Sequence, residues 1–283
     1  LSERSGPVRR SAHGGESTRT RPAGASRLAD TPVNIPAFQL SGRRALVTGS
    51  SRGIGFALAG ALAAAGAHVI LNARDAVRLD SAVAELRSAG LQVEARAFDV
   101  TREDEVNAAA ASLGRIDILV NNTGIHRRGP LETMPLADWN AVLETNLTSA
   151  FLVSRALAPG MITRRAGKII NVCSLMSELA RPTTGNYAAA KGGLKMLTRA
   201  MCAEWASHNI QVNGIAPGYI LTDLTQPLAA EAKFDAWIKG RTPAGRWGRV
   251  DDLTGACVFL ASSASDFVNG QILTIDGGLS AVI

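Results

Sequence analysis

The chain has 283 residues, of which 46% are hydrophobic and 19% charged, values typical of a globular protein with one large domain or two small ones. No apolar run approaches the roughly 20 residues that a membrane-spanning helix needs, so the sequence predicts no such helix. Half of the formal net charge of +6 lies in residues 1–34. Lysine and arginine are scattered over the rest, which argues against a nucleic-acid-binding surface.

The three cysteines, Cys173, Cys202 and Cys257, each lie in an apolar run. An odd number of cysteines in such surroundings favours reduced, buried thiols and a cytoplasmic location over a disulfide framework. None of them has a histidine or a second cysteine at ligand spacing, so no zinc site is expected.

Residues 1–34 are rich in Ser, Gly, Arg and Pro and contain few large apolar residues. Such a segment cannot bury enough surface to order itself, so we expect a disordered N-terminal extension. Two interpretations of it stay open. It could be sequence that does not belong to the native protein, or a transit peptide, which is also rich in Arg and Ser. The lack of an amphipathic stripe favours the first.

From Arg43 onward, short strand-like runs alternate with longer helical runs. Such alternation predicts an α/β fold for residues 35–283, a single-domain Rossmann-type doubly wound parallel sheet of about seven strands with helices on both faces. The predicted strands are Ala45–Val47, Ala67–Asn72, Val93–Phe98, Ile116–Asn121, Gly167–Val172, Ile210–Ile215 and Gln271–Ile275. The predicted helices are Gly53–Ala65, Val77–Ala89, Glu103–Leu113, Ala137–Leu157, Asn186–Ala206 and Val250–Leu260.

The first predicted strand ends in TGSSRGIG, residues Thr48–Gly55, which places three glycines between a strand and a helix. Glycine lets the backbone approach a phosphate closely at a helix N-terminus. In this context Gly49, Gly53 and Gly55 predict a dinucleotide-binding loop.

The second predicted strand leads into VILNARD, residues Val69–Asp75. Many dinucleotide sites have an acidic residue at this strand end, where it binds the adenosine ribose. Here Arg74 follows the strand, and Arg52 lies inside the glycine loop. Two guanidinium groups suit a 2′-phosphate, so NADP is the favoured cofactor. NAD remains possible, because Asp75 could turn inward.

The stretch GNYAAAK, residues Gly185–Lys191, places Tyr187 and Lys191 on one face of a predicted helix, one turn apart. A cation held near a phenol lowers its pKa, which would make Tyr187 useful as an acid and base. On its own, the pair could also be a core tyrosine beside a solvated lysine.

The stretch 221–248 separates the sixth and seventh predicted strands and contains two short helical patterns. Ligands of doubly wound sheets bind beyond the carboxyl ends of the strands. We therefore expect this insertion to form a lid over the substrate.

Further motifs follow the other strands, namely NNTG at Asn121–Gly124, Asn146 in a helix, Ser174 after IINVCS, and Pro217-Gly218. With the glycine loop and the Tyr–Lys pair, these motifs make residues 38–283 resemble the short-chain dehydrogenase/reductase family. Two features depart from the family pattern. Thr123 replaces an alanine, and the segment from Asp99 to Asn121 is about one helical turn short. Neither is expected to affect the site.

The resemblance implies a catalytic tetrad of Asn146, Ser174, Tyr187 and Lys191. Tyr187 would be the general acid and base, with Lys191 and the positive nicotinamide ring lowering its pKa and Ser174 donating a hydrogen bond to the substrate oxygen. Asn146 would hold a water of a proton relay. The implied cofactor-binding residues are Gly49, Ser51, Arg52, Gly53, Ile54, Gly55, Arg74, Asp99, Val100, Asn121, Gly124, Tyr187, Lys191, Pro217, Gly218, Ile220 and Thr222. The family also implies a homotetramer, formed with the apolar C-terminus.

Within the family, stretches such as IHRRGPLE at 125–132 and SELARP at 177–182 resemble the gluconate 5-dehydrogenases. This likeness implies carbohydrate metabolism, with interconversion of D-gluconate and 5-keto-D-gluconate. Arg127 or Arg128 could bind the carboxylate of such a sugar acid. Glu178 and Arg181 could bind its hydroxyl groups, while Ser174 and Tyr187 meet the reacting oxygen. Alternatively, these loop charges pair with one another at the rim, where we also place His126.

Two other functions remain open from the sequence. A different keto reductase of the family, such as a 3-oxoacyl-carrier-protein reductase, could bind its acidic carrier through the basic residues Arg127 and Arg128. A non-catalytic cofactor sensor on the same fold is the other alternative, because a fold does not imply a function. A sensor would need the glycine loop but not Asn146, Ser174, Tyr187 and Lys191, whose presence argues for an enzyme.

Overall fold

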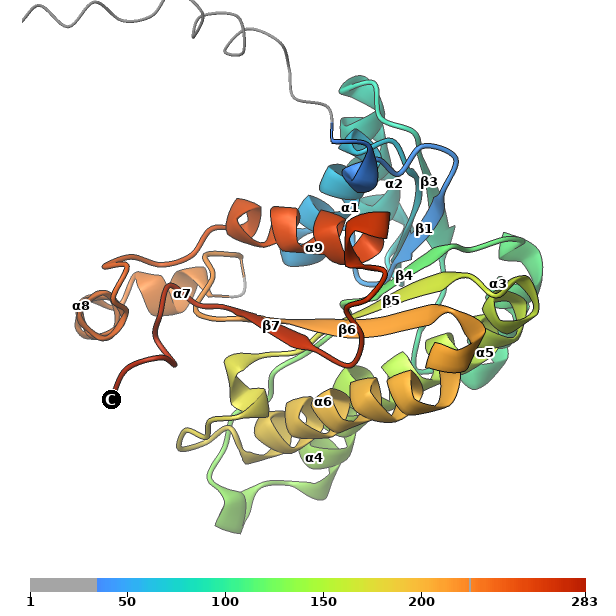
Figure 1. Cartoon of the computed structure of the whole chain (residues 1–283). Helices are drawn as coiled ribbons and strands as arrows, with labels where there is room; N and C mark the ends of the chain where they lie inside the picture. The colour runs from blue at the N-terminus through green and yellow to red at the C-terminus, as the bar shows by residue number, and fades with distance from the viewer. Residues whose placement is uncertain (1–34, 224) are drawn as a thin grey trace, which may run out of the picture. The chain divides into compact units, whose positions relative to one another are not determined.

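A parallel sheet of seven strands runs through the computed structural model, which describes residues 35–223 and 225–283 (Figure 1). The expected N-terminal extension, residues 1–34, lies outside these ranges. The strand order is β3-β2-β1-β4-β5-β6-β7, and every neighbouring pair is parallel. The doubly wound fold expected from the sequence is therefore confirmed. The strands are β1 Arg44–Val47, β2 His68–Ala73, β3 Val93–Ala97, β4 Ile118–Asn121, β5 Gly167–Val172, β6 Ile210–Pro217 and β7 Ile272–Ile275.

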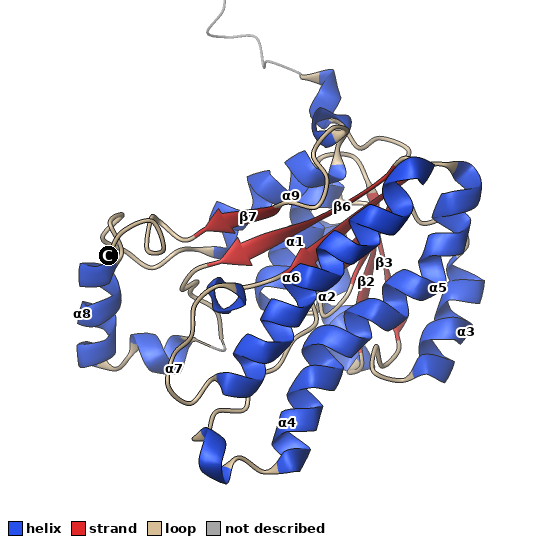
Figure 2. Ribbon diagram, turned by 60° about the horizontal axis from the view of Figure 1, so that its bottom comes forward, coloured by secondary structure: helices blue, strands red, loops and turns tan. Residues whose placement is uncertain are grey.

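Helices cover both faces of the sheet (Figure 2). On one face lie α1, α2 and α9, and on the other α3, α4, α5 and α6. The two short helices α7 and α8 lie beyond the carboxyl ends of β6 and β7. The helices are α1 Gly53–Ala64, α2 Ala76–Ser88, α3 Glu103–Leu113, α4 Leu136–Leu143, α5 Ser149–Arg164, α6 Gly185–Trp205, α7 Gln226–Ala229, α8 Ala232–Arg241 and α9 Thr254–Ala261.

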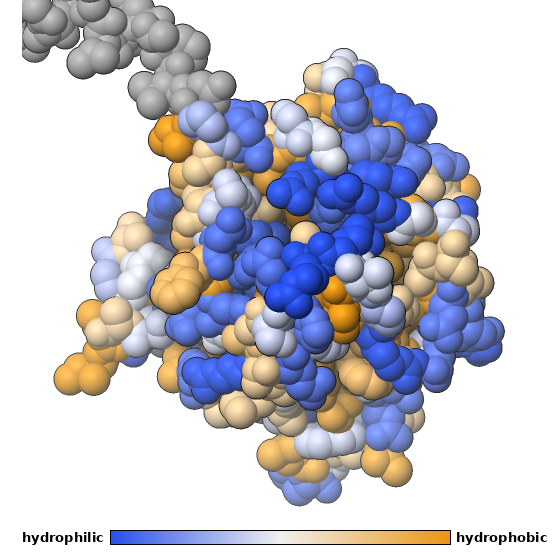
Figure 3. Space-filling view, turned by 45° about the vertical axis from the view of Figure 1, so that its right-hand side comes forward, coloured by the Kyte–Doolittle hydropathy of each residue, from blue (hydrophilic) through white to orange (hydrophobic). Residues whose placement is uncertain are grey.

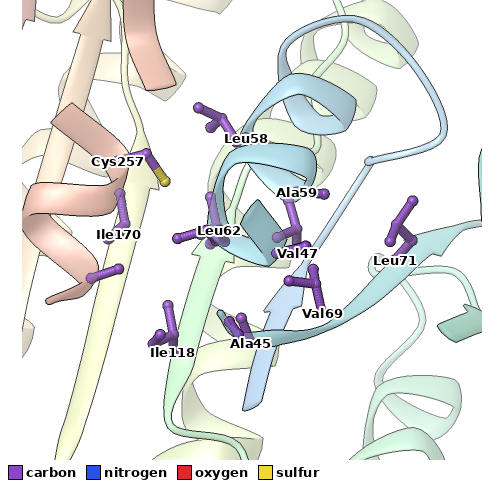
Figure 4. Close-up of a cluster of buried hydrophobic side chains, with 14 of the residues drawn as sticks. Ala45, Val47, Leu58, Ala59, Leu62, Val69, Leu71, Ile118, Ile170 and Cys257 are labelled. Carbon is purple, nitrogen blue, oxygen red and sulfur yellow. The ribbon is translucent and has the colours of Figure 1, made fainter. Parts of the chain in front are cut away.

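Side chains of the central strands alternate between two hydrophobic clusters, one on each face, because successive residues of a strand point to opposite sides. In β1, Ala45 and Val47 pack beneath α1 and α9, whereas Leu46 packs on the side of α3 and α5. Figure 4 shows the first cluster, in which Leu62 of α1 faces the strands and Cys257 of α9. Each fully buried leucine of this kind contributes about 2 kcal/mol to stability.

Two helices differ from the sequence prediction. The helix expected at Ala137–Leu157 is divided by a π-helical turn, Glu144–Thr148, and its second half continues to Arg164. Pro159 therefore lies inside α5 and does not end it. The last predicted helix begins as a 3₁₀ turn, Val250–Leu253, before α9. Neither change moves an element to the other face of the sheet.

Polar side chains dominate the face drawn in Figure 3, where apolar residues form small separate groups. Among the residues that the structure describes, none of the helices has the length and apolar character to span a membrane.

Candidate active site

A cleft of about 730 Å³ opens at the carboxyl ends of β1 and β4, where the strand order reverses direction. Ligands of doubly wound sheets bind at such a switch point. Its lining includes all four residues of the implied tetrad, Asn146, Ser174, Tyr187 and Lys191. The implied cofactor-binding residues that line it are Arg52, Gly53, Ile54, Gly55, Arg74, Gly124, Tyr187, Lys191, Pro217, Gly218, Ile220 and Thr222. Gly49, Ser51, Asp99, Val100 and Asn121 lie outside this lining.

The glycine loop is held in shape by the side chain of Asn122. Its Nδ2 donates hydrogen bonds to the main-chain oxygens of Thr48 at 2.9 Å and Gly49 at 3.0 Å. A Cβ atom at Gly55 would lie 2.4 Å from this Nδ2 and 2.5 Å from the Gly49 oxygen, so only glycine fits there. Gly49 and Gly53 have φ values of 61° and 57°, which glycine adopts without strain.

Asn122 lines the cleft, whereas its neighbour Asn121 is turned into the core. The Asn121 Nδ2 donates to Ser154 Oγ at 2.9 Å and to Asn171 Oδ1 at 2.8 Å. Its side chain thus ties β4 to β5 and α5. The sequence favoured Asn121 for the cofactor groove, and the structure places its neighbour Asn122 in the lining of the cleft and the Asn121 side chain in the core.

The positive charge expected near the adenosine end of the cleft comes from Arg52 and Arg74, both exposed. Arg74 donates to Asp99 at 3.3 Å, while Arg52 has no ion-pair partner among the described residues. Partial burial raises the pKa of Asp99, but hydrogen bonds from Thr101 and Arg74 outweigh it and hold that pKa below its ordinary value.

Asp75, which the sequence left open as a ribose ligand, caps α2 instead. Its carboxylate accepts a hydrogen bond from the main-chain nitrogen of Arg78 at 3.1 Å, as N-cap aspartates do. Asp75, the acidic residue that would favour NAD, therefore lies outside the lining of the cleft, whereas Arg52 and Arg74 line it.

Tyr187 and Lys191 lie in the first turns of α6 and face the cleft together. Lys191 is 3% exposed, and its Nζ donates a 2.7 Å hydrogen bond to the main-chain oxygen of Val172 at the end of β5. The expectation that these two residues share a face is met. Their shared cleft replaces the alternative of a core tyrosine beside a solvated lysine.

Burial governs the pKa values of both residues in the protein alone. Burial raises the pKa of the Tyr187 phenol, and this effect outweighs the lowering by a hydrogen bond with Ser174. Burial also lowers the pKa of Lys191 to about 8. The expectation that Lys191 and the nicotinamide ring lower the pKa of Tyr187 concerns the complex with cofactor; in the protein alone, removal of the phenol from water is the larger effect.

Asn146 belongs to the π-helical turn, a type of distortion that is frequent at functional sites. Its Nδ2 donates to the main-chain oxygens of Ile125 and Val142, each at 2.9 Å. Its Oδ1 is buried with no hydrogen-bond partner among the described residues. A Cβ at Gly124 would come within 2.6 Å of this oxygen and 3.8 Å of Lys191 Nζ, so Gly124 leaves a space between the two groups.

Ser174 follows β5 and begins a 3₁₀ turn, Leu175–Ser177. Its Oγ accepts a hydrogen bond from the main-chain nitrogen of Met176 at 3.1 Å, which fixes the hydroxyl beside the cleft. This bond uses only an acceptor position of Ser174 Oγ, so the hydroxyl hydrogen, which serves the hydrogen bond with Tyr187 in the protein alone, can be donated to a substrate oxygen.

A second, smaller cavity of about 140 Å³ adjoins the first, and both are lined by His126, Ser174 and Tyr187. Arg128 and Arg181 line the small cavity. Arg128 Nε donates to Thr183 Oγ1 at 3.3 Å and has no acidic partner among the described residues. Positive charge therefore gathers next to the tetrad, on the side away from the glycine loop.

Of the substrate residues expected from the sequence, Arg127 and Glu178 are engaged elsewhere. Arg127 lines the large cleft but forms an ion pair with Asp138, and Glu178 forms one with Lys195. The loop charges thus have partners, although they do not pair with one another as the alternative interpretation supposed. Arg181 does reach the small cavity, as expected.

Arg181 also joins the segment expected to be a lid. Its guanidinium donates to the hydroxyl of Tyr219 at 3.1 Å and lies 4.5 Å from the ring centroid of Phe234 in α8. Trp237 and Trp247 complete this group of aromatic rings. The segment between β6 and β7 is thereby connected to the small cavity through one cation.

Thr123, which replaces an alanine of the family pattern, lies at the end of β4 against the glycine loop. Its Oγ1 is buried with no hydrogen-bond partner among the described residues. Across residues 35–223 and 225–283, we find no group of three His, Cys, Asp or Glu side chains that could hold a metal ion.

Comparison with known proteins gives a consistent result. A family profile described as enoyl-(acyl carrier protein) reductase matches residues 49–280. The chain is 51% identical to the gluconate 5-dehydrogenase of Gluconobacter oxydans (strain 621H) over 247 residues, covering 86% of this chain and 96% of that protein. It is 50% identical to the 5-keto-D-gluconate 5-reductase of Escherichia coli (strain K12) over 250 residues, covering 87% and 98%.

A crystal structure of a gluconate 5-dehydrogenase from Burkholderia cenocepacia J2315, in complex with NADP and tartrate, superposes with a TM-score of 0.85. The two chains are 51% identical, and the match covers 87% of this chain and 98% of the other. A short-chain type dehydrogenase/reductase from Mycobacterium marinum matches with a TM-score of 0.82 at 37% identity, covering 87% and 98%.

Proposed function

Because the chain belongs to the short-chain dehydrogenase/reductase family, we propose that it is an NADP-dependent oxidoreductase that interconverts D-gluconate and 5-keto-D-gluconate. The observation that carries this proposal is the convergence of Asn146, Ser174, Tyr187 and Lys191 on one cleft at the switch point of the sheet. The chain is 51% and 50% identical in sequence to two enzymes named for gluconate and 5-keto-D-gluconate, which supports this choice of substrate.

The residues of the cleft fit a dinucleotide with a 2′-phosphate. The glycine loop excludes even a methyl group at Gly55, which lets a diphosphate approach the N-terminus of α1. Arg52 and Arg74 supply guanidinium groups at the far end of the cleft, and Asp75 is occupied as a helix cap. The complex of the Burkholderia enzyme with NADP supports the same choice.

When bound, NADPH supplies the hydride that the carbonyl carbon receives. We assign Tyr187 as the group that donates its phenolic proton to the carbonyl oxygen of the substrate, so that the ketone becomes an alcohol. Its raised pKa keeps the phenol protonated at neutral pH, which is the form that reduction requires. Ser174 would donate its hydroxyl hydrogen to the same oxygen as negative charge develops there.

Lys191 would stabilise the phenolate that remains after proton transfer, because its ammonium lies on the same helical face. The unpartnered Oδ1 of Asn146 and the space beside Gly124 suit a water molecule between Asn146 and Lys191. Such a water would return a proton from solvent towards Tyr187.

The small cavity suits the carboxylate end of a sugar acid. Arg128 has no acidic partner among the described residues, and Arg181 is held by Tyr219 and Phe234, so both can face an anion. Arg127 and Glu178, which the sequence favoured for the substrate, are assigned lesser roles because Asp138 and Lys195 neutralise them. We also propose that residues 221–248 act as the lid over this cavity.

The proposed activity is tested by following the absorbance of NADPH with the purified protein and 5-keto-D-gluconate. Fast oxidation is expected, with slower turnover when NADH replaces NADPH. An acetoacetyl thioester serves as the competing substrate of a carrier-protein reductase. Turnover of the thioester alone would refute the sugar acid as substrate while preserving the chemistry.

We further propose a cytoplasmic homotetramer. Cys173, Cys202 and Cys257 are all free thiols, which supports a reducing compartment. Val282 and Ile283 are 46% and fully exposed at the C-terminus, and such apolar ends are commonly covered in an oligomer. Light scattering of the purified protein would test the tetramer.

A further inference from the structure

His126 is fixed in the site by buried asparagines on both sides. The main-chain oxygen of the preceding residue, Ile125, accepts a 2.9 Å hydrogen bond from Asn146 Nδ2. The oxygen of the following residue, Arg127, accepts a 2.9 Å bond from Asn186 Nδ2. Both amides are at most 1% exposed. A loop residue held in this way is positioned before any ligand arrives.

The imidazole of His126 lies nearly parallel to the phenol ring of Tyr187. The ring centroids are 4.5 Å apart and the planes differ by 9°. Asn186 couples the two residues a second time, because its Oδ1 accepts a 2.7 Å hydrogen bond from the main-chain nitrogen of Tyr187. The orientation of the imidazole is therefore tied to that of the group that we assign to proton transfer.

His126 lines both the large cleft and the small cavity, so it stands where a substrate would pass from one to the other. Its Nδ1 is buried and has no hydrogen-bond partner among the described residues. Buried polar atoms are almost always paired in folded proteins, and an unpaired one beside a cavity indicates a group that a ligand satisfies.

The charge around the imidazole decides which ligand group it can bind. Burial, together with the nearby guanidinium groups of Arg128 and Arg181, lowers the pKa of His126, so the ring is neutral at pH 7. A neutral imidazole has one donor and one acceptor nitrogen and no charge to offer a carboxylate. In this cavity the arginines suit the carboxylate, and the histidine suits a hydroxyl group.

On the basis of the proposed function, we propose that His126 is a specificity residue that hydrogen-bonds a hydroxyl group on one of the two carbons flanking the reacting carbonyl of the sugar acid. Its stacking on Tyr187 sets the distance between that hydroxyl and the phenol. A site built to pair a substrate hydroxyl discriminates strongly against its loss, because its own polar atom is then left buried and unpaired.

Two substitutions separate the hydrogen bond from the stacking. His126→Phe keeps a ring against Tyr187 but removes both nitrogens, and His126→Gln keeps a hydrogen-bonding group without the ring. We expect His126→Phe to raise KM for 5-keto-D-gluconate about ten- to hundredfold, as loss of a buried hydrogen bond does. His126→Gln should remain within about threefold of the wild-type KM, the difference expected for a geometrically imperfect replacement.

His208→Phe is the matched control, since it makes the same change outside both cavities. Thermal melting and NADPH titration establish that each variant is folded and binds the cofactor. A wild-type KM in His126→Phe, or equal losses in His126→Phe and His126→Gln, would overturn the assignment of His126 alone. Failure of the wild-type protein to reduce 5-keto-D-gluconate would instead overturn the proposed function, and the assignment with it.

Discussion

The ammonium nitrogen of Lys191 lies 5.7 Å from the centroid of the Tyr187 ring, one helical turn along α6. The lysine is buried, and its Nζ donates a hydrogen bond to the main-chain oxygen of Val172. A cation that is held out of water in this way costs stability, and it is retained where its charge is useful.

Replacement of this lysine should separate stability from activity. We expect Lys191→Met to increase the free energy of unfolding at pH 7 by about 3 kcal/mol, because the pKa of Lys191 falls from 10.5 to about 8 on folding. The same variant should lose most of its turnover, because the phenolate of Tyr187 loses its stabilising charge. Urea denaturation and the NADPH assay measure the two effects.

The stability difference should also depend on pH. The wild-type lysine loses its proton near pH 8 when folded and near pH 10.5 when unfolded, so between these values the unfolded state binds more protons. The free energy of unfolding of the wild-type protein therefore rises as the pH increases from 8 to 10.5. The advantage of Lys191→Met should shrink between pH 8 and 10.5, and a constant difference would contradict the assigned burial effect.

Removal of the phenolic hydroxyl should abolish turnover without affecting the cofactor. Tyr187→Phe is expected to lower kcat by about a thousandfold, within the range that general acid–base catalysis contributes. Its NADPH dissociation constant, measured by fluorescence titration, should stay within about threefold of wild type, since the ring remains in place. Substantial turnover in this variant would refute Tyr187 as the proton donor.

Cofactor preference should depend more on Arg52 than on Arg74, because Asp99 already neutralises part of the Arg74 charge. We expect Arg52→Ala to weaken NADPH binding about ten- to hundredfold, as loss of a charge-assisted hydrogen bond does, and NADH binding hardly at all. Arg102→Ala, which changes an exposed arginine paired with Asp104, is the control. Equal losses for NADPH and NADH would exclude a contact with the 2′-phosphate.

Thr123 offers a test of the glycine-loop packing. Its hydroxyl is buried without a partner among the described residues, which costs about 1 kcal/mol or more. Thr123→Val keeps the shape and removes this polar group, so it should raise the free energy of unfolding by about 1 kcal/mol. Urea denaturation measures the change, and a less stable variant would show that the hydroxyl is satisfied in solution.

The order of strands and helices could be predicted because each strand is a short apolar run between helical patterns. All seven strands form, and the bounds of α3 are those expected, Glu103–Leu113. The π-helical turn at Asn146 could not be predicted, since it arises from the packing of α4 and α5 against α6 and leaves no periodicity of its own. The helix was also expected to end at Leu157, whereas α5 continues past Pro159 to Arg164, because propensity ignores tertiary contacts.

For the site, the motifs identified residue types but not the partners of their side chains. Arg127 and Glu178 were plausible ligands until the structure showed them in ion pairs with Asp138 and Lys195, which the motifs do not include. His126 was placed at the rim because the sequence does not show that a loop residue stacks on the Tyr187 ring of α6, 61 positions further along the chain. The effect of burial on the pKa of Tyr187 could not be predicted either, since burial is a property of the folded site.

The packing of α1 against α9 affects how the enzyme folds during its synthesis. Leu58 and Leu62, which follow the glycine loop, share a hydrophobic cluster with Leu253, Cys257 and Leu260 near the other end of the chain. A growing polypeptide therefore exposes the apolar side of its cofactor helix until nearly all of it has left the ribosome. Folding is then a late event that involves the whole domain, and chains that terminate before α9 should neither bind NADPH nor escape proteolysis.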